Sequence, residues 1–105
     1  MALADLFHAL GEPTRLEMVV RLSRGGSYTI TSLSQGLNIT RQGARKHLQV
    51  LADSKIIILE PKGRDTSVSL DMAALDLGKK FIADLELRWQ KRLEALRDFV
   101  EDQDL

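Results

Sequence analysis

The chain has 105 residues, 44% of them hydrophobic, which is enough apolar material for one small folded domain over residues 1–105. Its 15 basic and 15 acidic residues balance and it has no cysteine, so the composition excludes a strongly cationic protein, a disulfide framework and a thiolate metal site. No uncharged apolar run, including residues 56–59, approaches the roughly 20 residues of a membrane span, and residues 1–10 lack the basic start of a signal peptide. We therefore expect a cytoplasmic protein without a membrane partner.

The neutral total conceals an uneven distribution of charge. Residues 40–70 carry six basic residues against three acids, whereas residues 71–105 carry six against nine. Such a chain suits a protein that presents one cationic face to a polyanion and keeps its other face in water or against a partner.

Two helices are predicted before residue 25. The first lies within residues 1–11, ends at Gly11, and has apolar residues at helical spacing: Leu3, Leu6, Phe7 and Leu10. Pro13 suits the first turn of the second helix, because a proline there loses no intrahelical hydrogen bond. We expect the buried side of this helix to consist of Leu16, Val19 and Val20.

A helix-turn-helix is predicted over residues 31–53. Thr31 is the expected cap of a short helix, "TSLSQGL", and Thr40 is the expected cap of a longer helix over residues 40–53. The core-facing stripe of the longer helix is Ala44, Leu48 and Leu51. Its opposite, exposed side is polar and basic, and comprises Arg41, Gln42, Arg45, Lys46 and Gln49.

A β-hairpin and a long helix complete the pattern. The β-branched run "IIILE", the turn "PKGRD" and the alternating "TSVSL" predict a hairpin over residues 56–70 with Lys62 and Arg64 at its tip. From Asp71 onward helical spacing returns. Gly78 is the weak point of this helix, because glycine costs about 1 kcal/mol relative to alanine inside a helix, and the sequence leaves open whether the helix breaks there. The fold class predicted is mainly α with a small hairpin, in the order α-α-α-α-β-β-α.

Three segments, "ALGEPTRLEMVVRL", "LNITRQGARKHLQVL" and "KGRDTSVSL", resemble the first two helices, the recognition helix and the wing of the ArsR-type family of winged-helix repressors. The resemblance covers most of residues 3–71 and continues into a long last helix of the right kind. It implies a homodimeric winged helix-turn-helix protein that binds double-stranded DNA and represses transcription.

The chain departs from the metal-sensing members of that family. They resemble one another in having cysteines in the helix that corresponds to "TSLSQGL", or His and acidic ligands along the last helix. Here Ser32 and Ser34 stand at the first place, the last helix has no histidine, and the two histidines, His8 and His47, lie in different predicted helices. We expect the metal-independent branch, with no metal site, no cofactor and an unknown effector.

Placement in a helix-turn-helix favours DNA contact over a merely solvated face, because the second helix of this motif enters the major groove. The expected DNA-binding residues are Thr40, Arg41, Gln42, Arg45, Lys46 and Gln49, with Lys62 and Arg64 from the wing around residues 61–65. His47 is expected to have a structural or phosphate-adjacent role. Arg15 fits either a phosphate contact or an ion pair with an acid such as Glu12.

The last helix, over residues 72–101, is too long for one small domain to bury, so we expect residues 1–11 and 72–101 to form a dimer interface. The residues of this interface are Leu3, Leu6, Phe7, Leu10, Ile82, Leu85, Trp89, Leu93 and Leu96. An effector pocket along the same stripe, around Phe81 and Trp89, is the alternative.

No GxSxG, HExxH or phosphate-binding glycine motif and no cysteine nucleophile is present, so an enzyme is not expected. The alternatives to a DNA-binding repressor are a winged-helix protein-interaction module and a small-molecule-responsive sensor of the same fold.

Overall fold

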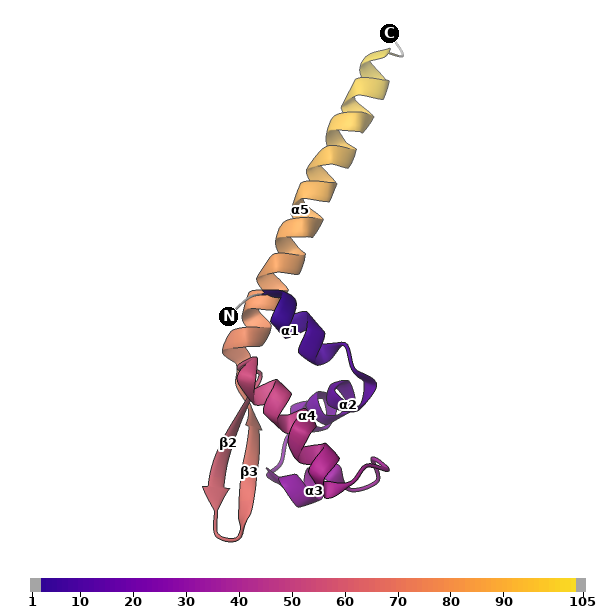
Figure 1. Ribbon diagram of the computed structural model, residues 1–105. Coiled ribbons are helices and arrows are strands. Elements are labelled where there is room, and N and C mark those ends of the chain that lie inside the picture. The colour runs from indigo at the N-terminus through magenta and orange to yellow at the C-terminus, as the bar shows by residue number, and fades with distance from the viewer. Residues whose placement is uncertain (1–2, 104–105) are drawn as a thin grey trace.

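The computed structural model describes residues 3–103 and confirms a mainly helical winged helix-turn-helix with a hairpin wing and a long last helix (Figure 1). Its elements in chain order are α1 (Leu3–Leu10), α2 (Pro13–Ser23), β1 (Tyr28–Thr29), α3 (Ile30–Ser34), α4 (Arg41–Asp53), β2 (Ile57–Lys62), β3 (Asp65–Leu70) and α5 (Met72–Gln103). The hairpin and the α3–α4 pair lie at the end of the molecule remote from the C-terminal end of α5 (Figure 1).

The sheet has three strands in the order β1-β3-β2, and all neighbours are antiparallel. Strand β1 was not predicted, because its two residues form a strand only by pairing with β3, where Tyr28 faces Val68. The predicted turn over residues 61–65 is also too long. Lys62 pairs with Asp65, so the turn is reduced to Gly63 and Arg64, and Gly63 takes a positive φ of 61°.

The start of α3 differs from the prediction as well. Its cap is Thr29 rather than Thr31, in a reciprocal capping box in which the Thr29 hydroxyl accepts from the backbone N–H of Ser32 and the Ser32 hydroxyl accepts from that of Thr29. Because this cap is also the last residue of β1, the strand leads directly into the helix-turn-helix.

The core confirms the predicted stripe of α4 but corrects that of α2. The largest fully buried side chains are Leu6, Met18, Leu33, Leu48, Leu51 and Ile56. On α2, Leu16 is 49% exposed and Val20 is 36% exposed, so two of the three predicted core residues lie outward. The buried stripe is instead Arg15, Met18, Val19 and Leu22, which keeps helical spacing but begins with a charged residue.

Helix α5 runs without interruption across Gly78, which answers the question that the sequence left open. Gly78 is buried, and an added Cβ atom would lie 2.7 Å from Cδ2 of Leu6 on α1. The glycine therefore serves close packing of two helices rather than a kink. Beyond residue 80 every described residue of α5 is exposed, and the helix projects away from the rest of the molecule (Figure 1).

Candidate nucleic-acid interface

Helix α4 begins at a defined cap and turn. The Thr40 hydroxyl accepts a hydrogen bond from the backbone N–H of Gly43 at 2.9 Å, as predicted for an N-cap. The connection from α3 passes through Gly36 and Asn38, which both have positive φ angles and so turn the chain sharply. On the inner side, Ala44 and Leu48 are completely buried. These local features hold α4 with one fixed face outward.

The outward face of α4 carries every recognition-helix residue proposed from the sequence. Their side chains are exposed, and they are Thr40, Arg41, Gln42, Arg45, Lys46 and Gln49. Gln49 also donates from Nε2 to Oδ1 of Asp53 at 2.8 Å, within the helix. The exposed side chains are therefore cationic toward the beginning of α4, whereas toward its end the Gln49 amide is already hydrogen-bonded within the helix.

The tip of the hairpin places Lys62 and Arg64 in solvent. Next to them, Asp65 is a residue that the sequence interpretation missed. The pKa of its carboxyl is lowered chiefly because the backbone N–H of Thr66 donates to Oδ1 at 2.8 Å; the Thr31 and Thr29 hydroxyls and the charge of Arg41 act in the same direction. Asp65, at the tip end of β3, therefore lies near the start of α3 and of α4, which are far from it in the sequence.

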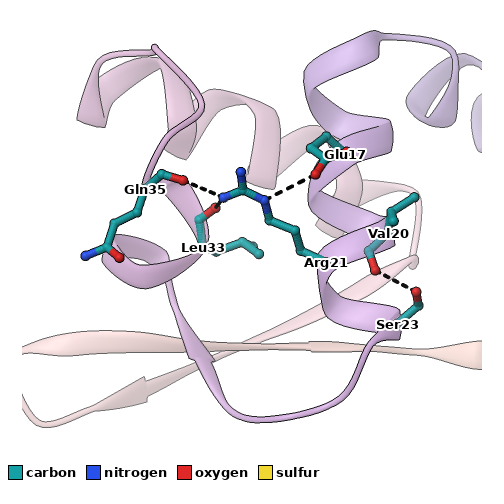
Figure 2. Close-up of polar contacts among 6 residues, drawn as sticks. All are labelled: Glu17, Val20, Arg21, Ser23, Leu33 and Gln35. Atoms are coloured by element: carbon teal, nitrogen blue, oxygen red, sulfur yellow. Dashed lines mark hydrogen bonds and ion pairs between the residues drawn. The ribbon is translucent and has the colours of Figure 1, made fainter.

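A second missed residue is Arg21, which holds the helix-turn-helix against α2 (Figure 2). Its Nη1 donates to the backbone carbonyls of Leu33, at 3.1 Å, and Gln35, while Nε lies 3.4 Å from Oε1 of Glu17. Figure 2 shows the guanidinium between the acid on its own helix and the carbonyls at the end of α3. Because the last carbonyls of a helix carry partial negative charge, this cation is well placed to stabilise that end.

Arg15 is 8% exposed, so it is not available for the phosphate contact considered from the sequence. Its side chain donates from Nε to the carbonyl of Ala9 at 2.7 Å and from Nη2 to that of His8 at 3.2 Å. The Glu12 carboxylate instead accepts from the backbone N–H of Arg15 at 2.9 Å and caps α2. Arg15 therefore binds neither of the two partners expected from the sequence, a phosphate or an acid, but the carbonyls at the end of α1.

His47 lies on α4 and has a structural environment. Its Nδ1 is 3.2 Å from Nη1 of Arg15 and 3.7 Å from Oε2 of Glu12. Because an arginine only donates, Nδ1 accepts in the first contact, which requires the neutral tautomer with the proton on Nε2. His8 is exposed on α1, so the two histidines do not form a common site.

The residues assigned to a dimer interface differ in how far they are exposed to solvent. Leu6 is buried inside the chain, whereas Phe7 is 37% exposed and lies beside Phe81, at 5.9 Å between ring centroids. Along α5 the stripe is exposed, with 60% of Trp89 accessible; its other members are Ile82, Leu85, Leu93 and Leu96. A mainly apolar groove of about 500 Å³ opens between the two helices, and its lining includes Leu6, Phe7, Leu10, Leu75, Gly78 and Ile82.

No three His, Cys, Asp or Glu side chains converge as a metal site within residues 3–103. The hydroxyls of Ser32 and Ser34 are engaged locally: Ser32 donates to the carbonyl of Thr29 at 3.3 Å, and Ser34 donates to that of Ile30 at 2.6 Å. None of the helices in the described part of the chain has both the length and the apolar character needed to cross a bilayer.

A family model described as a helix-turn-helix domain matches residues 10–60. No curated protein sequence matches the chain. Among solved structures, an ArsR-like transcriptional regulator from Rhodococcus sp. RHA1 is similar at 28% identity and a TM-score of 0.83, over 95% of this chain and 91% of that one.

Two repressors are also similar. The transcriptional repressor BigR from Xylella fastidiosa matches at 25% identity and a TM-score of 0.60, over 76% of this chain and 82% of its own. The antimony-specific transcriptional repressor AntR matches at 27% identity and a TM-score of 0.58, over 81% of this chain and 78% of its own.

Proposed function

We propose that this chain, which is an ArsR-like winged helix-turn-helix DNA-binding regulator and not an enzyme, acts as a homodimeric repressor that occupies an inverted-repeat operator. The observation that carries the proposal is the two-sided character of α4. One face is locked into the core, and the other exposes cations and amides beside a cationic wing tip.

Sequence readout is assigned to the beginning of α4. Arg41 and Arg45 have the geometry to bond guanine edges through two donors, and the Gln42 amide suits adenine. Thr40 and Lys46 contact adjacent phosphates, and Gln49 has a lesser share because its amide already bonds Asp53. Each good paired contact discriminates against a wrong base by about 1–3 kcal/mol.

The wing supplies attraction that does not depend on sequence. Lys62 and Arg64 lie at the exposed hairpin tip, and cations there lower the free energy of binding by releasing counterions from phosphate. Asp65 stands next to this tip, and the charge of Arg41 lowers the pKa of its carboxyl, which supports a position of the wing tip near the start of α4.

The partner that completes the molecule is a second copy. The apolar stripe of α5 continues from the α1–α5 groove through Trp89 and Leu96, and it is not covered by any other part of residues 3–103. A two-fold axis lets each copy present the same stripe and groove to the other, which removes both from water and places two α4 helices on one side. Repression then follows from occupying the operator, the role named for the similar BigR and AntR proteins.

Metal independence is part of the proposal. It is supported by the engaged hydroxyls of Ser32 and Ser34 and by the lack of histidine on α5. Chelator treatment is expected to leave DNA affinity unchanged.

Selection of duplexes from a random library, followed by gel shift, tests the function. We expect an inverted repeat with half-site centres roughly 34 Å apart, or one helical turn. Failure to enrich any motif would favour a protein-interaction module, and enrichment of isolated half-sites would contradict the homodimer.

A further inference from the structure

Two arginines of α2 bind the ends of two different helices. Arg15 donates to the carbonyls of His8 and Ala9 at the end of α1, and Arg21 donates to those of Leu33 and Gln35 at the end of α3. Helix α2 therefore holds one helix of the proposed dimer interface with one arginine and the first helix of the helix-turn-helix with the other.

Arg15 makes a third connection that Arg21 does not. Its remaining terminal nitrogen, Nη1, lies 3.2 Å from Nδ1 of His47, halfway along the recognition helix α4. One buried guanidinium thus belongs to α2, bonds α1 and reaches α4. The planar group has its donors in fixed directions, so satisfying all three partners restricts how α1 and α4 are oriented.

Helix α4 also meets α1 near its end, where the Ser54 hydroxyl donates to the carbonyl of Asp5 at 3.4 Å. Ser54 is buried and caps the carboxyl end of α4. With that end held at Ser54, the contact between Arg15 and His47 is the second point that stops α4 from swinging relative to α1.

We infer that Arg15 is a positioning residue that sets the angle between α1 and the recognition helix, and thereby the half-site spacing that the dimer accepts. This inference rests on the proposed function, because spacing has meaning only for two copies on an inverted repeat. Arg15 itself touches no DNA. Because Arg15 is buried, replacing it removes none of the exposed side chains that are assigned to base readout.

The test uses the full chain and the inverted repeat selected by the wild-type protein, with the half-site separation altered in single base-pair steps. The wild-type protein is expected to prefer one separation sharply. In Arg15→Lys, the single ammonium keeps a cation beside the α1 carbonyls but cannot also reach His47. The ratio of affinities for the best and the adjacent separation is expected to fall about tenfold, the lower end of what a hydrogen bond to a charged group contributes.

A second pair of variants approaches the contact from α4. His47→Phe removes the acceptor while Arg15 keeps its carbonyl partners. It is expected to flatten the spacing profile, that is, the dependence of affinity on half-site separation. This variant remains informative if Arg15→Lys does not fold. His47→Gln retains an acceptor and should keep the profile. Arg24→Lys, at an exposed arginine just beyond α2, is the matched control for Arg15→Lys.

Affinity for a single half-site, thermal stability and oligomeric state are measured for each variant. A folded Arg15→Lys dimer with the wild-type spacing profile would overturn the inference alone, and so would a uniform loss of stability and half-site affinity with an unaltered profile. If the wild-type protein selects no inverted repeat, the proposed function fails and the inference with it.

Discussion

Leu6 of α1 lies over Gly78 of α5 so closely that Cδ2 of the leucine is 2.7 Å from where a Cβ atom of residue 78 would be. Leu6 is 1% exposed and Gly78 is buried, so neither side of this contact has free space. Glycine has a low helix propensity, but at this point of α5 it leaves a notch, the space beside its Cα atom that the Leu6 side chain fills. The contact fixes where the groove between the two helices begins.

Gly78→Ala is therefore expected to destabilise the fold although alanine is the better helix former. Overpacking costs about 1–3 kcal/mol, which exceeds the gain of about 1 kcal/mol in helix propensity over most of its range. In a Leu6→Ala background the same change should become stabilising, because the notch is then empty. Thermal melting of the four proteins checks this, and a Gly78→Ala effect of the same sign in both backgrounds would contradict the packing relationship.

Arg41→Ala and Arg45→Ala are each expected to weaken binding to the selected operator about tenfold or more and to relax base preference at one position, since a paired base contact contributes roughly 1–3 kcal/mol. Lys80→Ala, an exposed cation on α5 away from the apolar stripe, serves as the control and should bind normally. Fluorescence anisotropy with operator and single-base variants measures both effects. An unchanged base preference in both variants would contradict the assignment of sequence readout to Arg41 and Arg45.

The Lys62→Ala/Arg64→Ala double variant should weaken binding to all duplexes to a similar extent. Losing two phosphate contacts is expected to reduce the slope of log affinity against log salt concentration by about 1.8, at roughly 0.9 for each contact. Anisotropy titrations between low and moderate salt provide the slope. A wild-type slope in this variant would show that the wing stays clear of the DNA.

Leu85→Asp is expected to convert the dimer to a monomer, because it places a charge on the apolar stripe of α5. The monomer should stay folded, since this side chain is already exposed in the single chain. Leu87→Asp is the matched control: Leu87 is also exposed, but two residues further along a helix it points to the opposite side. Sedimentation equilibrium distinguishes the outcomes, and equal effects of both changes would reject the stripe as the interface.

Glu12 is expected to make stability depend on acid pH. The pKa of its carboxyl is lowered chiefly by the hydrogen bond from the backbone N–H of Arg15, and the charge of Arg15 acts in the same direction. A group with a lowered folded-state pKa contributes stability that is complete above its unfolded pKa of about 4.3 and is lost as pH falls through the folded value. Glu12→Gln should therefore melt below the wild-type protein at pH 7, and the difference should shrink as the pH falls below the unfolded pKa. A melting difference that does not change with pH would contradict this role.

Much of the fold was predictable because its signals are local. The spacing of Ala44, Leu48 and Leu51 identified the buried face of α4, and with it the exposed face that carries Arg41 and Arg45. A cap such as Thr40 and a hairpin with a central glycine depend on the conformation of a few neighbouring residues, so their positions are visible in the order of amino acids.

The errors occurred where partners come from distant segments. Strand β1 exists only through pairing with β3. Which face of α2 is buried depends on the α1 carbonyls that accept hydrogen bonds from Arg15. A charged residue is ordinarily assigned to the surface, so helical spacing alone selected Leu16 and Val20 for the core instead. The chain order contained no sign that carbonyls of α1 would bond this guanidinium.

The sequence by itself determined the succession of helices and hairpin, the cationic middle segment and the two-sided recognition helix, because side-chain periodicity and capping act over a few residues. Only the tertiary structure decided that Gly78 makes room for Leu6 rather than breaking α5, that Arg15 is buried, and that Asp65 lies near the start of α4. Each of these depends on which atoms from remote segments come within a few ångströms. Close packing and the need to pair buried polar groups set those distances, and both are properties of the assembled chain.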